Sequence, residues 1–155
     1  MGDITKNFSL SEFARCREGL QDVPHDVEHT ITYRLAPKLQ YLRDRIGRPI
    51  RITSGYRSEA YNKRIGGSKT SRHVYGLAAD IDVANMGADE LAQLVVDIAT
   101  EQGEPWDQVI SYPKTGGHVH VGLAPEGQQP RGEKRRKLPS GSYPHVFRFT
   151  EESQR

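Results

Sequence analysis

Two short segments of the chain alternate strictly between polar and apolar residues, and this pattern constrains the fold more than any other feature. They are residues 79–83 (ADIDV) and residues 118–122 (HVHVG). Because successive side chains of a β-strand point to opposite faces of a sheet, each segment is predicted to be a strand with one apolar and one polar face. The apolar faces need helices or further strands to cover them.

The remaining patterns predict helices and more strands. Helices are expected from the capping box Ser9-Leu10-Ser11-Glu12, over residues 26–46 with a kink or division at Pro37 and a cap at Gly47, and over residues 58–65 and 88–101. Strands are expected at 49–53, 109–112 and 145–149, with a turn at 113–117. Without a regular βαβ alternation, these elements predict an α+β fold with a small, mostly antiparallel sheet and packed helices.

The length of 155 residues suits one domain with one core. The chain becomes polar after residue 123, so we expect a domain over residues 1–123 and a polar, basic extension over residues 124–155 that packs on it. No apolar run approaches the ~18 residues of a membrane span, so no integral membrane segment is expected. The N-terminus lacks a basic region followed by an apolar run, so we expect synthesis in the cytoplasm without a signal peptide. A monomer is expected.

Cys16 is the only cysteine in the sequence. Neither an internal disulfide nor a cysteine-based zinc cluster can form, so any metal must be held by histidine and carboxylate side chains. Cys16 itself lies in a short helical pattern and is expected to be a small buried residue.

A basic cluster, defined as Arg131, Lys134, Arg135, Arg136 and Lys137, lies near the C-terminus. Such a cluster suggests an anionic partner, such as a cell-wall polymer, a membrane surface or a nucleic acid, although a solvated tail explains it equally well. No predicted helix carries a basic stripe with interleaved aromatic residues, so a nucleic acid is not the expected partner.

The polar faces of the two alternating strands carry side chains that can bind metals. Asp80 and Asp82 lie on the first strand, His118 and His120 lie on the second, and His73 precedes Asp80 in a glycine-containing loop. A loop His, a strand Asp and one later His would supply two nitrogens and one oxygen, the usual ligand set of a catalytic zinc with an open fourth position. A salt bridge, an edge strand or plain surface exposure would explain the same residues without a metal.

Arg57 follows the strand at 49–53 and a Ser-Gly turn. A guanidinium in this place can clamp a carboxylate with two parallel hydrogen bonds. A surface arginine that pairs with Glu59 is the alternative.

These clusters occur in an order that resembles a known family. Residues 71–80 (SRHVYGLAAD) fit the pattern S-x-H-x-x-G-x-A-x-D at every fixed position, and an H-x-H pair follows at residues 118–120. The turn at residues 54–58 (SGYRS) and the opening residues 7–13 (NFSLSEF) are also similar. Over residues 7–123 the chain resembles the zinc D-alanyl-D-alanine carboxypeptidase family, which includes phage endolysins that cleave peptidoglycan stem peptides, and more distantly the hedgehog signalling domain.

The resemblance implies a role for each matched residue. His73, Asp80 and His120 match the zinc ligands, Arg57 matches the arginine that holds the substrate's carboxylate, and His118 matches the histidine beside the reacting carbonyl. Ser71 opens the motif, with a structural or substrate-binding role. Some related sequences read H-V-D-V-G, and on that alignment His118 would be the ligand, whereas the H-x-H branch favours His120.

One position departs from the family pattern. Endolysin and dipeptidase members carry Asp or Glu three residues before the last ligand, as a general base, whereas this chain has Gly117. Either His118 transfers the protons, or an acid from elsewhere reaches the site, or catalysis is weak.

The resemblance implies a hedgehog/D,D-peptidase-like fold and a zinc peptidase, with one Zn²⁺ per chain, that cleaves stem peptides at D-Ala-D-Ala or L-Ala-D-Glu. A phage or prophage lytic or tail-associated enzyme fits this function, and it would reach the bacterial wall after release or on a phage particle. The basic cluster would then bind an anionic wall polymer. Gly117 supports the alternative, a non-catalytic, zinc-containing cell-wall binding module.

Overall fold

The structure, a computed structural model, describes residues 2–114 and 117–150. Residues 115–116, within the predicted turn at 113–117, lie outside the described residues, as do residue 1 and residues 151–155 at the end of the expected extension. None of the described helices has the length and apolar character that spanning a bilayer requires.

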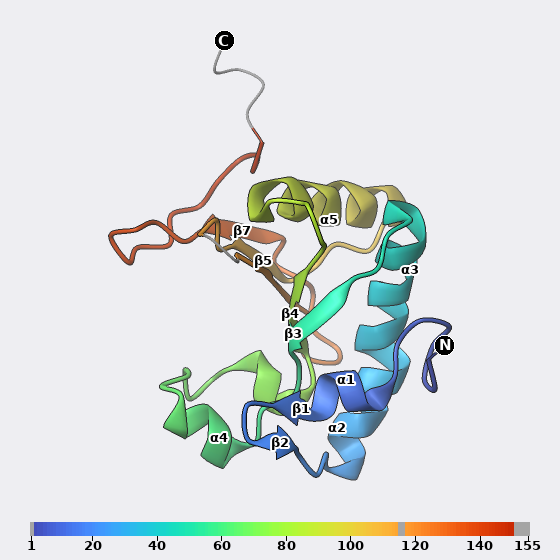
Figure 1. Ribbon diagram of the computed structural model, residues 1–155. Helices are drawn as coiled ribbons and strands as arrows, with labels where there is room; N and C mark the ends of the chain where they lie inside the picture. The colour runs from blue at the N-terminus through green and yellow to red at the C-terminus, as the bar shows by residue number, and fades with distance from the viewer. Residues whose placement is uncertain (1, 115–116, 151–155) are drawn as a thin grey trace.

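The centre of the molecule is a five-stranded sheet (Figure 1). In spatial order its strands are β3 (Arg51–Ser54), β4 (Ala78–Asp82), β6 (Val119–Gly122), β5 (Gln108–Ser111) and β7 (Glu133–Arg136). The pairs β3–β4, β4–β6 and β6–β5 are antiparallel, and the pair β5–β7 is parallel. A separate hairpin consists of β1 (Arg15–Cys16) and β2 (Gly19–Leu20). The predicted α+β fold with a small, mostly antiparallel sheet is confirmed.

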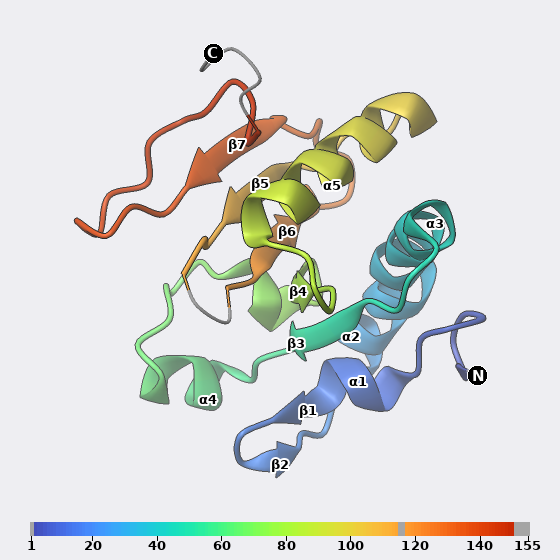
Figure 2. The ribbon, with the colours of Figure 1, turned by 45° about the horizontal axis from the view of Figure 1, so that its top comes forward.

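Helices surround this sheet. In the described residues the α-helices are α1 (Leu10–Ala14), α2 (His25–Thr30), α3 (Ala36–Ile46), α4 (Glu59–Arg64) and α5 (Ala88–Gln102). The long helices α3 and α5 pack against each other, and α5 also packs on β5 and β6. The short helix α4 lies with the β1–β2 hairpin, away from α5 (Figure 2).

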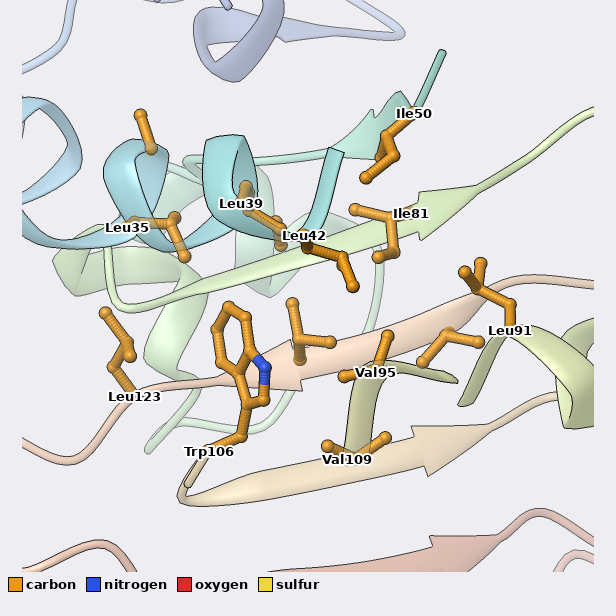
Figure 3. Packing of buried hydrophobic residues seen from close by; sticks show 14 of the residues in the cluster. Leu35, Leu39, Leu42, Ile50, Ile81, Leu91, Val95, Trp106, Val109 and Leu123 are labelled. Carbon is orange, nitrogen blue, oxygen red and sulfur yellow. The ribbon is translucent and has the colours of Figure 1, made fainter. Parts of the chain in front are cut away.

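The core lies between the apolar face of the sheet and the helices α3 and α5. The side chains of Leu42 on α3, Ile81 on β4 and Val95 on α5 point into the same space (Figure 3) and are almost fully buried. Burial of a side chain of this size contributes about 1.5–3 kcal/mol relative to leaving it exposed. The apolar faces predicted from the alternating segments are confirmed, because Val119 and Val121 on β6 are also fully buried.

The register between β4 and β6 places the polar side chains opposite one another. Asp80 pairs with His120, and Ile81 pairs with Val119. Each apolar residue thus faces the core while its polar neighbour points to the other face, as the period of two requires. The two predicted polar faces therefore combine into a single polar surface.

The helix predicted over residues 26–46 is divided by a change of helix type. A π-helix, Ile31–Leu35, joins α2 to α3, and the amide of Ala36 donates to the carbonyl oxygen of Ile31. Pro37 is the second residue of α3. Proline has no N–H and its ring crowds the carbonyl four residues earlier, so the wider π turn relieves a contact that a regular helix would impose. Gly47 ends α3 in the left-handed conformation (φ 75°), as predicted for the cap.

Two local predictions are wrong. Residues 145–149, predicted as a strand, contain only an isolated bridge between His145 and Arg135. The strand of this region is instead β7, inside the basic cluster. Cys16 was predicted to be a buried residue of a helix, but it lies in β1 and is half-buried, because α1 ends at Ala14.

The basic cluster attaches the C-terminal segment to the sheet. Arg131 pairs with Asp107, Arg135 with Glu133 and Arg136 with Asp89, while Lys134 donates to the carbonyl oxygen of Phe147 and Lys137 lies over the rings of Tyr112 and Tyr143. Every cation of the cluster thus has a contact inside the molecule. A freely solvated tail does not describe this arrangement.

Candidate metal centre

Three side chains from separate parts of the chain meet on the polar face of the sheet. His73 lies in the 3-10 helix Arg72–Tyr75, Asp80 on β4 and His120 on β6. Their candidate ligand atoms all lie within 4.8 Å of one another. His120 Nδ1 is 3.0 Å from Asp80 Oδ1, and His73 Nε2 is 3.3 Å from each of these two atoms.

The motif S-x-H-x-x-G has a local structural explanation. Ser71 caps the 3-10 helix, and its Oγ accepts a hydrogen bond from the amide of His73 at 3.3 Å. Gly76 ends the same helix with φ 72°, and a Cβ at this position would contact Val27 at 2.9 Å and Ile31 at 3.1 Å. The serine therefore starts the turn that carries His73, and only glycine fits where the chain leaves it.

A hydrogen bond from His73 sets the orientation of its ring. Nδ1 is 2.7 Å from the carbonyl oxygen of Gly55, which can only accept, so Nδ1 carries the proton. Nε2 of the neutral ring then has a free lone pair directed toward Asp80 and His120. A backbone carbonyl behind a histidine is the usual support of a metal-binding imidazole.

The charge states of Asp80 and His120 suit a cation. Burial raises the pKa of Asp80, but the hydrogen bonds with His120 and His73 outweigh it, and the net pKa is well below the usual range of a carboxyl. Burial lowers the pKa of His120, which favours the neutral imidazole. An ionised carboxylate and neutral imidazoles are the forms that bind metals, so the donor set fits a divalent ion bound by two nitrogens and one oxygen.

Arg57 lies at the edge of this triad. Its Nη2 is 3.3 Å from Asp80 Oδ2, and its Nε donates to Ser54 Oγ at 3.1 Å. The alternative pairing with Glu59 is not found among the described residues. The guanidinium thus holds the second oxygen of Asp80 and turns the first toward the two imidazoles.

His118 lies beside the triad and outside it. Its Nε2 is 3.8 Å from Asp80 Oδ2, and its ring stacks on that of Tyr112 with centroids 4.3 Å apart. Burial is the main cause of its pKa, which is below the ordinary value of histidine. His118 is therefore oriented as a neutral imidazole next to the space where a ligand of the metal would lie.

Two further positions singled out in the sequence, Asp82 and Gly117, do not enter the triad. Asp82 shares the face of Asp80 but pairs with Arg51, whose Nη2 is 2.5 Å from its Oδ2. Gly117 lies at the end of the β5–β6 connection, and a Cβ there would contact the carbonyl oxygens of Tyr112 and Lys114, the latter at 2.6 Å. Position 117 therefore has no room for the acidic side chain that the resemblance to endolysin and dipeptidase sequences would place there.

A groove with a cavity volume of about 810 Å³ adjoins the triad. Arg57, Asp80 and His118 line it, and Arg15 and Arg17 of the β1–β2 hairpin line it as well. Sequence patterns did not single out the hairpin arginines, because the strands of the hairpin have only two residues each. Tyr112 falls in the strand expected at 109–112, but nothing in that pattern pointed to a place beside His118. The groove offers a peptide-sized space next to the candidate metal ligands.

Comparison with known proteins identifies the family of the chain. The family described as peptidase M15 matches residues 6–122, a segment that contains the triad, Arg57 and His118. The chain is similar to the "Zinc D-Ala-D-Ala carboxypeptidase" of Streptomyces albus G, with 34% identity over 87 residues. That alignment covers 54% of this chain and 32% of the relative, so the chain matches about a third of the relative's length. Because the family match covers most of the sequence, the chain belongs to the peptidase M15 family.

Proposed function

We propose that this chain is a zinc-dependent peptidase that cleaves the stem peptides of bacterial peptidoglycan. The observation that carries the proposal is the convergence of His73, Asp80 and His120, with Arg57 and His118 at the side of the triad that borders the groove. Membership of the peptidase M15 family and the similarity to a zinc D-Ala-D-Ala carboxypeptidase support it.

The ligands in this proposal are His73 through Nε2, His120 through Nδ1 and Asp80 through Oδ1, with one Zn²⁺ per chain. Zinc bound there would act as a Lewis acid toward the peptide carbonyl and lower the pKa of water to about 7. Ser71 contributes indirectly, because its hydroxyl caps the turn that holds His73. The 3.8 Å separation of His118 from Asp80 Oδ2 supports His120 as the third ligand.

Arg57 and His118 would bind and protonate the substrate. Arg57 would hold the substrate's terminal carboxylate through Nη1, because Nη2 contacts Asp80 and Nε donates to Ser54 Oγ. His118, kept neutral near pH 7 by its lowered pKa, would accept a proton and return it to the leaving amine. The stack on Tyr112 keeps the His118 ring in place for both transfers.

The finer parts of the proposal concern the bond and the setting. The scissile bond is D-Ala-D-Ala, as in the name of the relative, or L-Ala-D-Glu. We propose a phage or prophage lytic or tail-associated enzyme that acts as a monomer on the bacterial cell wall after release or on a phage particle.

A second candidate is a non-catalytic, zinc-containing module that binds the cell wall. Gly117 favours it, because the family's acidic base is missing and the loop has no space for one. In this reading the triad would have a structural role, and His118 would not transfer protons.

Digestion of purified peptidoglycan separates the two candidates. The zinc-loaded chain is incubated with and without a chelator, and released fragments are identified by mass spectrometry. Chelator-sensitive release of free D-Ala indicates a carboxypeptidase, and a new D-Glu amino end indicates an endopeptidase. A protein that holds zinc and binds the wall but releases no fragment would be the binding module. The His120→Ala variant is the control for contaminating hydrolases.

A further inference from the structure

The β1–β2 hairpin forms one wall of the groove beside the metal centre. Arg15 and Arg17 line this wall and are exposed, and Cys16 between them is half-buried. The hairpin lies beside α4 in both views of the molecule (Figures 1 and 2). Its arginines therefore face the same space as Arg57 and His118.

The groove has an excess of positive charge. Four arginines line it, Arg15, Arg17, Arg51 and Arg57, against two carboxylates, Glu12 and Asp80. The carboxylates are already engaged, because Glu12 accepts from the amide of Ser9 and Asp80 faces the two imidazoles.

Two arginines of the groove have no acidic partner of their own in the part of the chain that the structure describes. Arg51 pairs with Asp82 and Arg57 with Asp80. Within residues 2–114 and 117–150, neither Arg15 nor Arg17 forms an ion pair. Two guanidiniums that face a groove without a counter-charge attract an anionic ligand.

The hairpin is fixed, so these guanidiniums start from a defined place. Gln21 donates to the carbonyl oxygens of Ala14 and Tyr56 and accepts from the amide of Ser58, which ties the hairpin to the turn that carries Arg57. At the tip, Arg64 of α4 binds Glu18 through two hydrogen bonds of 2.5 and 2.9 Å. This pair also neutralises Glu18, the acidic residue of the hairpin, so that the remaining charge of the hairpin is that of Arg15 and Arg17.

We propose that Arg15 and Arg17 form a subsite for a second carboxylate of an acidic peptide, distinct from the carboxylate held by Arg57. The subsite rests on the proposed peptidase function, and it makes the enzyme selective for substrates with a free internal carboxylate. A peptide is the fitting ligand because Asp80 of the triad and His118 line the same groove as the two arginines. An anionic polymer that binds through its charge alone would not have to reach the metal ligands.

The test uses the zinc-loaded full chain and two synthetic stem peptides of the same sequence. In one peptide an internal residue has a free carboxylate, from its side chain or its α-carbon, and in the other peptide this carboxylate is amidated. Both peptides keep the C-terminal carboxylate. The wild type should cleave the acidic peptide with a kcat/KM about tenfold above that of the amidated one. In the Arg15→Gln/Arg17→Gln variant this ratio should fall to about one, through loss of activity on the acidic peptide alone.

The matched control is Arg48→Gln/Arg148→Gln, which removes the same charge from exposed positions that do not line the groove. It should leave the ratio unchanged. An equal loss of activity on both peptides in the hairpin variant would show a structural role, and an unchanged ratio would show no role; either result overturns the subsite.

The failure of the subsite and the failure of the proposed function are distinguishable. If the wild type cleaves neither peptide, the peptidase proposal fails, and calorimetric binding of the two peptides then decides on the subsite. About tenfold tighter binding of the acidic peptide, lost in the hairpin variant, supports it. Equal binding of both peptides, or displacement of the acidic peptide by inorganic polyphosphate at equal concentration, overturns it.

Discussion

Nδ1 of His73 donates a hydrogen bond to the carbonyl oxygen of Gly55 at 2.7 Å. This bond couples a candidate metal ligand to the turn that carries Arg57. A second bond joins the same two segments, because the amide of Arg57 donates to the carbonyl oxygen of His73 at 3.2 Å. Gly55 has no space for a side chain, because a Cβ there would be 2.6 Å from Cα of Phe13. The two motifs that flank the groove are thus held together by their backbones, which keeps His73 and Arg57 in a fixed mutual position.

The two histidines of the H-x-H pair should behave differently when truncated. His120→Ala removes a zinc ligand. The affinity of this variant for zinc should fall by more than about 100-fold, because loss of a residue that only hydrogen-bonds to a ligand already costs up to that much. His118→Ala should bind zinc as the wild type does and lose turnover. Competition with a chromogenic chelator measures the affinity. The reverse outcome, with zinc lost only in His118→Ala, would make His118 the third ligand.

A side chain at position 117 should destabilise the protein. In Gly117→Ala the new Cβ would collide with the carbonyl oxygens of Tyr112 and Lys114, and the free energy of unfolding should drop by roughly 1–3 kcal/mol. Urea denaturation measures it. Gly87→Ala is the control, because its Cβ meets nothing within 4 Å and only the N-cap preference of α5 is lost, so it should cost less than about 1 kcal/mol. Equal stability of both variants would mean that the β5–β6 connection adapts to a side chain.

Asp107 should make the stability of the protein depend on acid pH. Burial raises the pKa of Asp107, but the hydrogen bonds from Arg131 and the charge of Arg72 outweigh it, and the net pKa is below the ordinary value. A lowered folded-state pKa means that the stabilisation is complete above the unfolded-state pKa of about 3.9 and is lost as the pH falls through the folded-state value. Asp107→Asn should therefore cost about 2 kcal/mol at pH 7 and progressively less at a pH below the unfolded-state value of about 3.9. Urea midpoints at both pH values measure this difference.

The comparison for Asp107 is Asp97→Asn. Asp97 is half-exposed and lies 3.9 Å from Arg148, so its loss should change the free energy of unfolding by less than about 0.5 kcal/mol at either pH. If both variants show the same pH profile, the contacts of Arg131 with Asp107 do not hold the C-terminal segment.

Tyr112 should act on turnover through His118. Tyr112→Leu removes the stack, whose centroids are 4.3 Å apart, and kcat should fall by up to about tenfold while KM and zinc content stay the same. Tyr112→Phe keeps the ring and should restore kcat. The exposed Tyr33 packs against His29 of α2 with the rings tilted and their centroids 4.6 Å apart, and it provides the control Tyr33→Leu, with no expected change. A rise in KM with unchanged kcat would assign Tyr112 to substrate binding instead.

The sequence could predict the parts of the fold where one periodic pattern dominates. The alternation around Ile81 and Val119 predicted β4 and β6, because burying one face of a strand demands a period of two. β7 was missed, because Glu133–Arg136 consists of four charged residues with little intrinsic preference for strands. Its position depends on the free edge of β5 and on tertiary ion pairs such as Arg131 with Asp107.

The same limit applies to the site. His73 and Asp80 stand in a motif with fixed spacing and His120 stands in the later H-x-H pair, so the sequence pointed to them, with His118 as the alternative to His120. Arg15 and Arg17 lie in a hairpin with strands of two residues each, too short for any periodicity. Their closeness to His118 arises only when Gln21 ties the hairpin to the turn at residues 55–58.

Because Asp80 pairs with His120, the metal centre forms only when β4 and β6 have the native register. If β6 slid by one residue against β4, a valine would stand opposite Asp80 and His120 would turn into the core. Zinc would then bind only the chains with the native alignment, and each tenfold of free zinc above its dissociation constant would favour them by about 1.4 kcal/mol. The ion would thus select the correctly folded chain during synthesis and refolding, in addition to any part it takes in the reaction.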